Sequence, residues 1–296
     1  MSAKYPIIAI TGSSGSGTSS VMETFENIFR REGVRAATIE GDSFHRYDRE
    51  EMKARQKEEA ATGNINFSHF GLDTNLLDDL EQLFKSFSET GQGKRRRYLH
   101  NHEEAEPYQQ PPGTFTPWEA LPKGTELLFY EGLHGAVQNE TCNIAQYPDL
   151  IIGVVPVINL EWTQKILRDK SSRGYSTETI TDTILGRMPD YVKHICPQFS
   201  NTHVNFQRVP MVDTSNPFVS REIPSADESM VVIRFAEPRG VDFPYLLEMI
   251  GGSFMSRANT LVVPGGKMQL AMQLIFTPYV WRLMKQRRRV LEQANG

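Results

Sequence analysis

Cysteine is scarce in this sequence, which has only Cys142 and Cys196 among its 296 residues. Neither cysteine belongs to a C-x-x-C pair, so the sequence offers no disulfide framework and no paired-thiol motif. Isolated cysteines of this kind are typical of a reducing compartment. We therefore expect reduced thiols and a cytoplasmic protein.

Long hydrophobic runs and excess positive charge are also missing. No apolar run reaches the roughly 20 residues of a transmembrane helix. The N-terminus lacks the pattern of a secretory signal peptide, because it enters an expected strand by residue 6. The formal net charge of −4 argues against nucleic acid or an anionic membrane as the main partner. What remains, 39% hydrophobic and 23% charged residues, is the composition of an ordinary globular protein.

A loop rich in glycine and serine follows the first apolar run. Residues 7–10 are apolar, and Val21, Phe25 and Ile28 recur at helical spacing after the loop. A strand, a glycine-rich loop and a helix in this order form a phosphate cradle, because loop N–H groups and the helix dipole both face the anion. The context predicts ATP-binding residues at Gly12, Ser13, Ser14, Gly15, Ser16, Gly17, Thr18, Ser19 and Ser20.

The loop departs from the phosphate-binding pattern G-x-x-x-x-G-K-[ST] at one position. Gly12 and Gly17 have the required spacing, and Ser19 stands where a Mg²⁺-binding hydroxyl belongs. Thr18 replaces the lysine. The loop is either a turn that begins a helix without a ligand, or a nucleotide site whose positive charge comes from elsewhere in the chain.

Asp42 follows a second expected strand, residues 35–42. In open α/β sheets ligands lie beyond the carboxyl ends of the strands, so we expect Asp42 at the same edge as the phosphate loop. His45, Arg46, Arg49 and Lys53 come next, at positions that would fall on successive helical turns. These charges form either a solvated face or a site for an anionic substrate, and charge patterning alone does not separate the two.

A second carboxylate ends the apolar strand expected at residues 126–132. In enzymes with a phosphate-binding loop, an acidic residue at the end of a neighbouring strand contacts the Mg²⁺ shell. Glu131 occupies that position here. A third strand, 149–158, leads into a helical segment in which Lys165, Arg168 and Asp169 share one face. That face is either exposed with an internal ion pair, or turned to the site to supply the charge that the phosphate loop lacks.

The other segments are expected to complete an α/β fold. We predict a loop over 62–74, a helix capped by Asn75, and an exposed basic run at 94–97 that is either an anion-contacting loop or a connector. A further helix is expected over 178–195, followed by strands at 209–212, 229–235 and 254–263. The last helix begins at Lys267, and its basic C-terminal end is expected to be solvated.

These segments together resemble one family, the bacterial type of phosphoribulokinase within the uridine kinase-like P-loop kinases. The likeness covers about the whole chain, so we expect one domain over residues 1–296. The family also lacks the loop lysine. The matching blocks are Gly12–Ser19, Glu40–His45, Leu128–His134, Val154–Lys165, Arg168–Asp169, Arg173–Tyr175, Asn205–Pro210, Val212–Pro217 and Phe254–Asn259.

The resemblance implies ATP-dependent phosphorylation of D-ribulose 5-phosphate at its 1-hydroxyl, as used in the Calvin cycle. By matching position, Asp42 would be the catalytic base, Lys165 would stand in for the loop lysine, and Asp169 would assist at the metal or phosphoryl group. The sugar phosphate would be held by His45, Arg49, Arg168 and Arg173. The Mg²⁺ ligands would be drawn from Ser19, Glu131 and Asp169.

The resemblance to the family's bacterial members implies a homo-octamer that is activated by NADH and inhibited by AMP. The matching effector positions are Arg31, Arg234 and Arg257, and we expect Tyr98 and His100 near that effector site or the neighbouring subunit. Gly186 precedes Arg187, where the resemblance implies a second arginine.

The implied fold is a three-layer P-loop kinase-like α/β fold with a mixed, mostly parallel sheet flanked by helices. Two rival functions remain open at this stage. A uridine or pantothenate kinase would share the fold but would not need an anion-binding cluster. A non-catalytic nucleotide sensor would explain the missing lysine but would not need the carboxylates.

Overall fold

The computed structural model describes residues 4–13, 18–173 and 176–295. Eight strands form one sheet in the order β2-β5-β1-β6-β7-β8-β10-β9. The first five strands in this order, β2, β5, β1, β6 and β7, run parallel. The strands β8, β10 and β9 add antiparallel pairs at the other edge. The predicted mixed, mostly parallel sheet is confirmed. The strands are β1 Ile7–Gly12, β2 Ala36–Glu40, β5 Leu127–Gly132, β6 Leu150–Val155, β7 Val204–Pro210, β8 Ser229–Phe235, β9 Phe254–Arg257 and β10 Thr260–Pro264.

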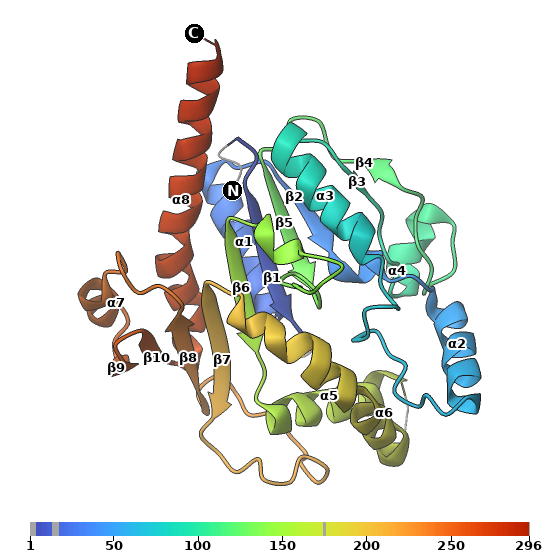
Figure 1. Cartoon of the computed structure of the whole chain (residues 1–296). Coiled ribbons are helices and arrows are strands. Elements are labelled where there is room, and N and C mark those ends of the chain that lie inside the picture. The colour runs from blue at the N-terminus through green and yellow to red at the C-terminus, as the bar shows by residue number, and fades with distance from the viewer. Residues whose placement is uncertain (1–3, 14–17, 174–175, 296) are drawn as a thin grey trace.

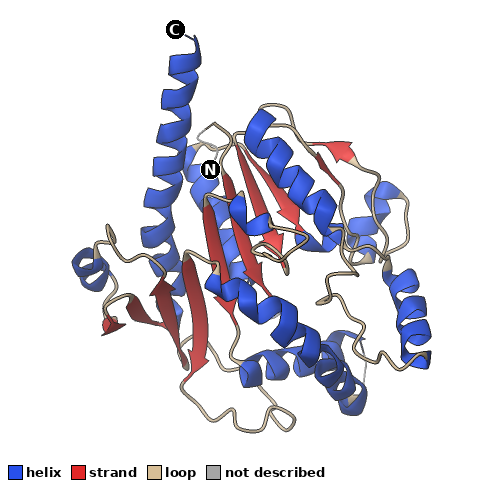
Figure 2. Cartoon of the chain, viewed as in Figure 1, coloured by secondary structure: helices blue, strands red, loops and turns tan. Residues whose placement is uncertain are grey.

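Helices cover both faces of this sheet (Figures 1 and 2). The helices α1 and α8 lie on one face, α3 lies on the other, and α5 and α6 lie beyond the carboxyl ends of the parallel strands. The α-helices are α1 Thr18–Glu32, α2 Arg49–Ala61, α3 Leu77–Thr90, α4 His102–Ala105, α5 Ile158–Arg173, α6 Thr177–Asp190, α7 Phe243–Met249 and α8 Met268–Asn295. A small separate sheet pairs β3 Lys94–Arg95 with β4 Glu119–Ala120.

Two apolar cores explain why the central strands read as continuous hydrophobic runs. In β1, Ile8 and Ile10 face the core under α1 and α8, whereas Ile7 and Ala9 face the core under α3. A strand buried on both faces needs apolar residues at every position. Aromatic rings fill the first core, where Phe25 lies 5.1 Å from Phe129 and 5.0 Å from Phe276 between ring centroids.

Several predicted boundaries are wrong in ways that the structure explains. The strand expected at 209–212 is β7, Val204–Pro210, whose first residue pairs with Ile152 in β6. Its start was missed because Asn205, Gln207 and Arg208 interrupt the apolar residues. The single strand expected at 254–263 is two strands, β9 and β10, that pair antiparallel. The helix expected over 178–195 ends at Asp190 and continues as a π-helical turn over 191–195.

The predicted cap of α3 is also wrong. The N-cap of α3 is Leu76, which makes no side-chain cap bond. The Asn75 amide instead donates to the carbonyl oxygens of His69 and Gly71 at 3.0 and 2.7 Å. The side chain therefore braces the preceding loop, which spans 62–74 as predicted.

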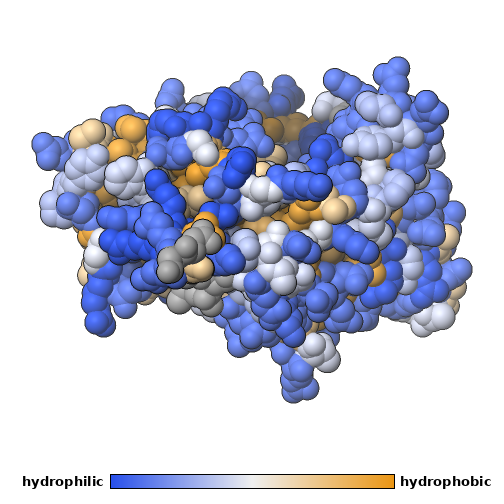
Figure 3. Space-filling view, turned by 90° about the horizontal axis from the view of Figure 1, so that it is seen from above, coloured by the Kyte–Doolittle hydropathy of each residue, from blue (hydrophilic) through white to orange (hydrophobic). Residues whose placement is uncertain are grey.

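The end of the molecule at which the parallel strands begin is mostly hydrophilic, with small hydrophobic patches between (Figure 3). Within the described ranges, no helix is long and apolar enough to cross a membrane. Cys142 and Cys196 are both free thiols, as expected.

Candidate active site

Asp42 reaches the carboxyl edge of the sheet through a close contact between two glycines. After β2, residues Gly41–Phe44 form a 3-10 turn. A Cβ on Gly41 would lie 2.7 Å from the Cα of Gly132, at the end of β5. Because both residues are glycines, the turn can pack directly against β5, which places Asp42 near Glu131.

Two imidazoles flank the Asp42 carboxylate. His45 Nε2 lies 3.5 Å from Oδ1, and His100 Nε2 lies 3.9 Å from Oδ2. The Asp42 side chain is 42% exposed. An accessible carboxylate with neighbouring imidazole groups can accept a proton from a bound hydroxyl, which is the geometry required of a general base.

His45 is buried and stacks on a histidine that the sequence did not single out. The ring centroids of His45 and His69 are 3.9 Å apart. Burial lowers the pKa of His45 to about 3, with His134, His100, Arg187 and Arg96 adding to the effect, and it lowers the pKa of His69 to about 3 as well. Both imidazoles are therefore neutral near pH 7, so His45 can hydrogen bond to a phosphate but adds no positive charge.

A buried contact between the Asn75 amide and the His134 imidazole lies next to the His45–His69 stack. His134 Nε2 lies 3.1 Å from Asn75 Nδ2 and 3.2 Å from the His69 carbonyl oxygen. Burial lowers the pKa of His134 to about 4. His134 belongs to a block that matched the resembled family, but nothing in the sequence indicated that it would meet the 62–74 loop.

Arg49 and the extended segment of residues 94–118, here called the arm, lie on the same side of the site. Arg49 begins α2, and its Nη2 donates to the His100 carbonyl oxygen at 2.7 Å. The Tyr98 ring lies 6.2 Å from the His45 ring. Tyr98 and His100 were expected near the effector site or the neighbouring subunit. Within this chain, His100 lies beside Asp42 at the β2 edge of the sheet, whereas Arg234 and Arg257 lie on β8 and β9 toward the other edge, so the neighbouring subunit stays the prediction.

Helix α5 carries two cations that share one carboxylate. Lys165 Nζ lies 2.6 Å from Asp169 Oδ2, and Arg168 Nε lies 3.1 Å from Asp169 Oδ1. Asp169 is 3% exposed, so the carboxylate of this ion pair is buried and not exposed as in the alternative interpretation, although the Arg168 side chain is 41% exposed. Burial lowers the pKa of Lys165, whereas the hydrogen bond to Asp169 opposes that shift.

Glu161, one turn earlier in α5, joins this helix to the start of the phosphate loop. Its Oε1 accepts a hydrogen bond from Ser13 Oγ at 2.6 Å. Burial raises the pKa of Glu161, and the bond from Ser13 and the nearby Lys165 and Arg168 lower it. The sequence did not single out Glu161, because its partner lies 148 residues earlier in the chain.

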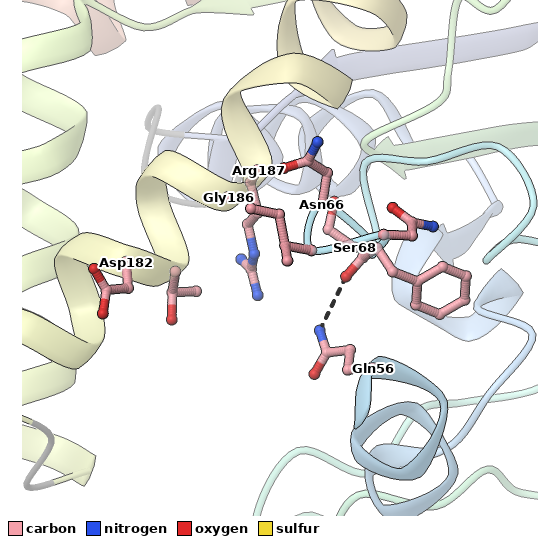
Figure 4. Close-up of a pocket in the computed structure, with 10 residues that line it drawn as sticks. Gln56, Asn66, Ser68, Asp182, Gly186 and Arg187 are labelled. Carbon is pink, nitrogen blue, oxygen red and sulfur yellow. Dashed lines mark hydrogen bonds between the residues drawn. The ribbon is translucent and has the colours of Figure 1, made fainter. Parts of the chain in front are cut away.

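Arg187 lies between the stacked histidines, His45 and His69, and the Lys165–Asp169 pair of α5. Its charge lowers the pKa of His45 and His69 on one side and of Lys165 on the other. It also lines a polar cavity of about 260 Å³ between α6 and the 62–74 loop (Figure 4). Gly186 forms part of the same wall, at the position where the family resemblance implies a second arginine.

Several predicted residues lie outside the described part of the chain. The loop residues Ser14, Gly15, Ser16 and Gly17 are among them, and so are the side chains of Thr18, Ser19, Ser20 and Arg173. Gly12 ends β1 and Ser13 is buried directly after it. Residues 18–32 form the helix predicted to follow the loop.

The Phosphoribulokinase / Uridine kinase family matches residues 7–215 of the chain. The chain belongs to this family. It is 72% identical over 98% of its length to the plasmid phosphoribulokinase of Cupriavidus necator, covering 99% of that protein, and 63% identical over 97% of its length to the phosphoribulokinase of Nitrobacter vulgaris, also covering 99%. The solved phosphoribulokinase from Rhodobacter spheroides aligns with a TM-score of 0.90 at 57% identity, over 97% of this chain and 100% of that one. The chain is therefore a kinase.

Membership of a kinase family implies ATP as the phosphoryl donor, and kinases commonly bind ATP together with Mg²⁺. Proteins hold Mg²⁺ through one or two carboxylates plus substrate phosphates and water, rather than through a protein cage. The described residues contain no group of three or more His, Cys, Asp or Glu that could hold a metal ion. Both oxygens of Asp169 contact cations, so a metal ion bound there would share the carboxylate with Lys165 and Arg168.

The predicted effector arginines fall into two places in the chain. Arg234 in β8 and Arg257 in β9 both pair with Thr260 in β10, so they lie on either side of the same residue. Arg31 lies in α1, where its Nη2 donates to Thr277 Oγ1 in α8 at 2.7 Å. The neighbours of Arg234 in β8 point into the core under α1 and α8, so Arg234 points to the opposite face of the sheet.

Proposed function

We propose that this kinase transfers the γ-phosphoryl group of MgATP to the 1-hydroxyl of D-ribulose 5-phosphate. The products are D-ribulose 1,5-bisphosphate and ADP, and the reaction belongs to the Calvin cycle. Two observations carry the proposal: an accessible carboxylate, Asp42, and the Lys165–Asp169–Arg168 group of α5. Arg187 lies close enough to both for its charge to lower the pKa of His45 and that of Lys165. The names of the relatives at 63–72% identity support the choice of substrate.

In the proposed mechanism Asp42 accepts the proton of the substrate hydroxyl. The hydroxyl oxygen then forms a bond to the γ-phosphorus while the bond from that phosphorus to the β,γ-bridging oxygen breaks. Ser19 with Glu131 or Asp169 would hold Mg²⁺, whose charge would offset that of the phosphates. Lys165 turns from Asp169 to the transferring group and replaces the missing loop lysine, because phosphoryl transfer depends mainly on positioning and charge neutralisation.

The phosphate of the substrate explains the remaining arginines. Arginine binds phosphate through a planar fork of donors, and its charge does not titrate. Arg49, Arg168 and Arg173 would supply this fork, and neutral His45 would add a hydrogen bond. Substrates of the rival uridine and pantothenate kinases carry no phosphate and would leave this group unused.

Regulation and assembly complete the proposal. We propose that the whole chain acts as one domain in a cytoplasmic homo-oligomer, an octamer by resemblance. NADH activates it through Arg31, Arg234 and Arg257. Arg31 lies in α1 and the other two lie in β8 and β9, and we propose that copies from two subunits complete the site.

The test is a coupled ADP-release assay with MgATP and D-ribulose 5-phosphate, with uridine and pantothenate as rival substrates. Asp42→Asn should lower kcat by about 10²–10⁴-fold, because a positioned base contributes that much, and should leave MgATP binding nearly unchanged by calorimetry. Exposed Asp73→Asn is the matched control. Turnover of uridine without turnover of ribulose 5-phosphate would refute the substrate, and full turnover in Asp42→Asn would refute the base.

A further inference from the structure

The basic run Lys94–Arg97 has no role in the function proposed above. Successive side chains of an extended strand point to opposite faces, and the run follows this rule. Arg95 pairs with Glu119 across the small sheet at 2.9 Å, at the surface. Arg96 points the other way, toward the side on which Tyr98 and His100 meet the site.

Arg96 binds the turn that carries Asp42. Its Nε donates to the Ser43 carbonyl oxygen and its Nη2 donates to the His45 carbonyl oxygen, both at 2.7 Å. These two carbonyl groups lie on either side of Phe44. The His45 N–H in turn donates to the Asp42 carbonyl oxygen at 3.2 Å, so both contacts of Arg96 act on the backbone next to the proposed base.

The guanidinium plane is fixed by aromatic rings. It lies 3.7 Å from the centroid of Phe115 and 4.8 Å from that of Trp118. Trp118 also contacts Phe44 edge-on at 5.5 Å. Rings on the arm thus hold the donor fork in the orientation that two neighbouring carbonyl groups require, and stacking of this kind is specific to arginine.

The opposite side of the turn is held by different partners. The Leu76 N–H donates to the Phe44 carbonyl oxygen at 2.7 Å, and the Arg46 N–H donates to the Thr74 carbonyl oxygen at 2.8 Å. Carbonyl groups along the turn therefore alternate between the arm and the 74–76 segment. Loss of Arg96 would leave the carbonyl groups of Ser43 and His45 without these donors and the turn anchored from one side.

We propose that Arg96 is a positioning residue for Asp42: it fixes the 42–45 turn so that the carboxylate faces the substrate hydroxyl. The inference rests on the proposed function, in which Asp42 is the base. Arg96 itself touches neither substrate nor nucleotide. A displacement of about 1 Å at a reacting group can cost about 10²-fold in rate, so loss of the two contacts should lower kcat by about that factor.

A double-mutant cycle with Asp42 separates positioning from a general structural role. We would measure kcat with radiolabelled ATP for the wild type, Arg96→Ala, Asp42→Asn and the double variant. Residues that act as a unit are strongly non-additive, so Arg96→Ala should cost about 10²-fold alone but less than about 3-fold in the Asp42→Asn background. Arg95→Ala is the matched control from the same strand, and it should keep full activity.

Two further measurements keep the result decisive. Arg96→Lys, which keeps the charge but not the fork, replaces Arg96→Ala in the cycle if the alanine variant unfolds. Methylguanidinium should restore part of the turnover of Arg96→Ala and none of that of Asp42→Asn. Unchanged activity in Arg96→Ala, or an equal loss in both backgrounds, overturns the positioning role and leaves the base assignment intact; full turnover in Asp42→Asn overturns the base assignment instead.

Discussion

At the scale of single residues, the Lys165–Asp169 contact has two roles that conflict. In the structure Lys165 neutralises a carboxylate that is 3% exposed. In the proposed reaction the same ammonium group neutralises the transferring phosphoryl group. Removing one partner of a buried pair is costly because the other charge stays buried, although here Arg168 still contacts Asp169.

We therefore expect Lys165→Met to lower kcat by about 10²–10³-fold, the range for loss of one preorganised donor at a developing charge. It should also lower the free energy of unfolding by about 1–3 kcal/mol, because a buried polar group loses a partner. Turnover and urea unfolding would be measured on the same samples. Exposed Lys170→Met on the same helix should change neither quantity, and wild-type kcat in Lys165→Met would contradict the assignment.

Three buried histidines predict a loss of stability in mild acid. Burial lowers the pKa of His45 and His69 to about 3 and that of His134 to about 4. A histidine of the unfolded chain has a pKa of about 6.5. The unfolded state therefore binds more protons below that pH, and stability that is complete above about pH 6.5 falls as the pH falls toward 4.

We expect His134→Gln to reduce this pH dependence by up to about 1.4 kcal/mol per pH unit, the contribution of one proton. The free energy of unfolding would be measured at pH 7.5 and 5.5 for both proteins. The quantity that matters is the difference between the two pH values, since the substitution itself also alters stability. Equal differences for variant and wild type would show that His134 titrates normally in the folded state.

At the scale of elements, the site depends on how closely the 3-10 turn after β2 approaches the end of β5. A Cβ on Gly132 would lie 2.6 Å from the Cα of Gly41 and 2.6 Å from Tyr130 Oη. No side-chain rotation relieves a clash with backbone, so the turn would have to move away from the sheet. Asp42 would move with it.

Gly132→Ala should therefore destabilise the protein by about 1–3 kcal/mol, the usual cost of overpacking, and lower kcat by more than the stability loss explains. Gly186→Ala is the control, because a Cβ there meets only the Ile65 carbonyl oxygen at 3.4 Å, and alanine favours a helix interior. Calorimetric melting and turnover at a temperature well below the midpoint would be compared. A fully active Gly132→Ala would show that the turn tolerates the shift.

At the scale of the whole molecule, the proposed base and two of the three proposed effector arginines, Arg234 and Arg257, lie toward opposite edges of the sheet. Asp42 follows β2 at one edge, whereas Arg257 lies in β9 at the other. Any effect of NADH on turnover must therefore pass across the sheet or between subunits. Coupling of this kind is measured as a change in affinity or activation, separate from basal rate.

Arg257→Ala should blunt activation by NADH and leave basal turnover near that of the wild type, because the residue is exposed and lies at the sheet edge opposite Asp42. The assay is turnover with and without NADH, together with sedimentation to measure assembly. Arg239→Ala, an exposed arginine after β8, is the control. Unchanged activation in Arg257→Ala would remove this residue from the proposed effector site.

Local physics determined the parts of this protein that the sequence predicted. Periodicity acts over a few neighbours, so the first strand and the first helix, β1 and α1, were predictable, as were the apolar strands β5 and β6. The same rule failed for β7, because the second half of this strand is only partly buried and its sequence includes polar residues. Asp42, Lys165 and Asp169 could be placed at the ligand edge because each follows a strand that ends there.

Only the tertiary structure decided which residues meet around them. Arg96 and Ser43 are 53 positions apart, Glu161 and Ser13 are 148 apart, and His134 and His69 are 65 apart. A single sequence carries no periodic or compositional trace of such contacts, because they arise from the packing of a long arm and two loops onto the sheet edge. The burial that keeps His45 neutral has the same origin: it depends on neighbours contributed by segments far along the chain.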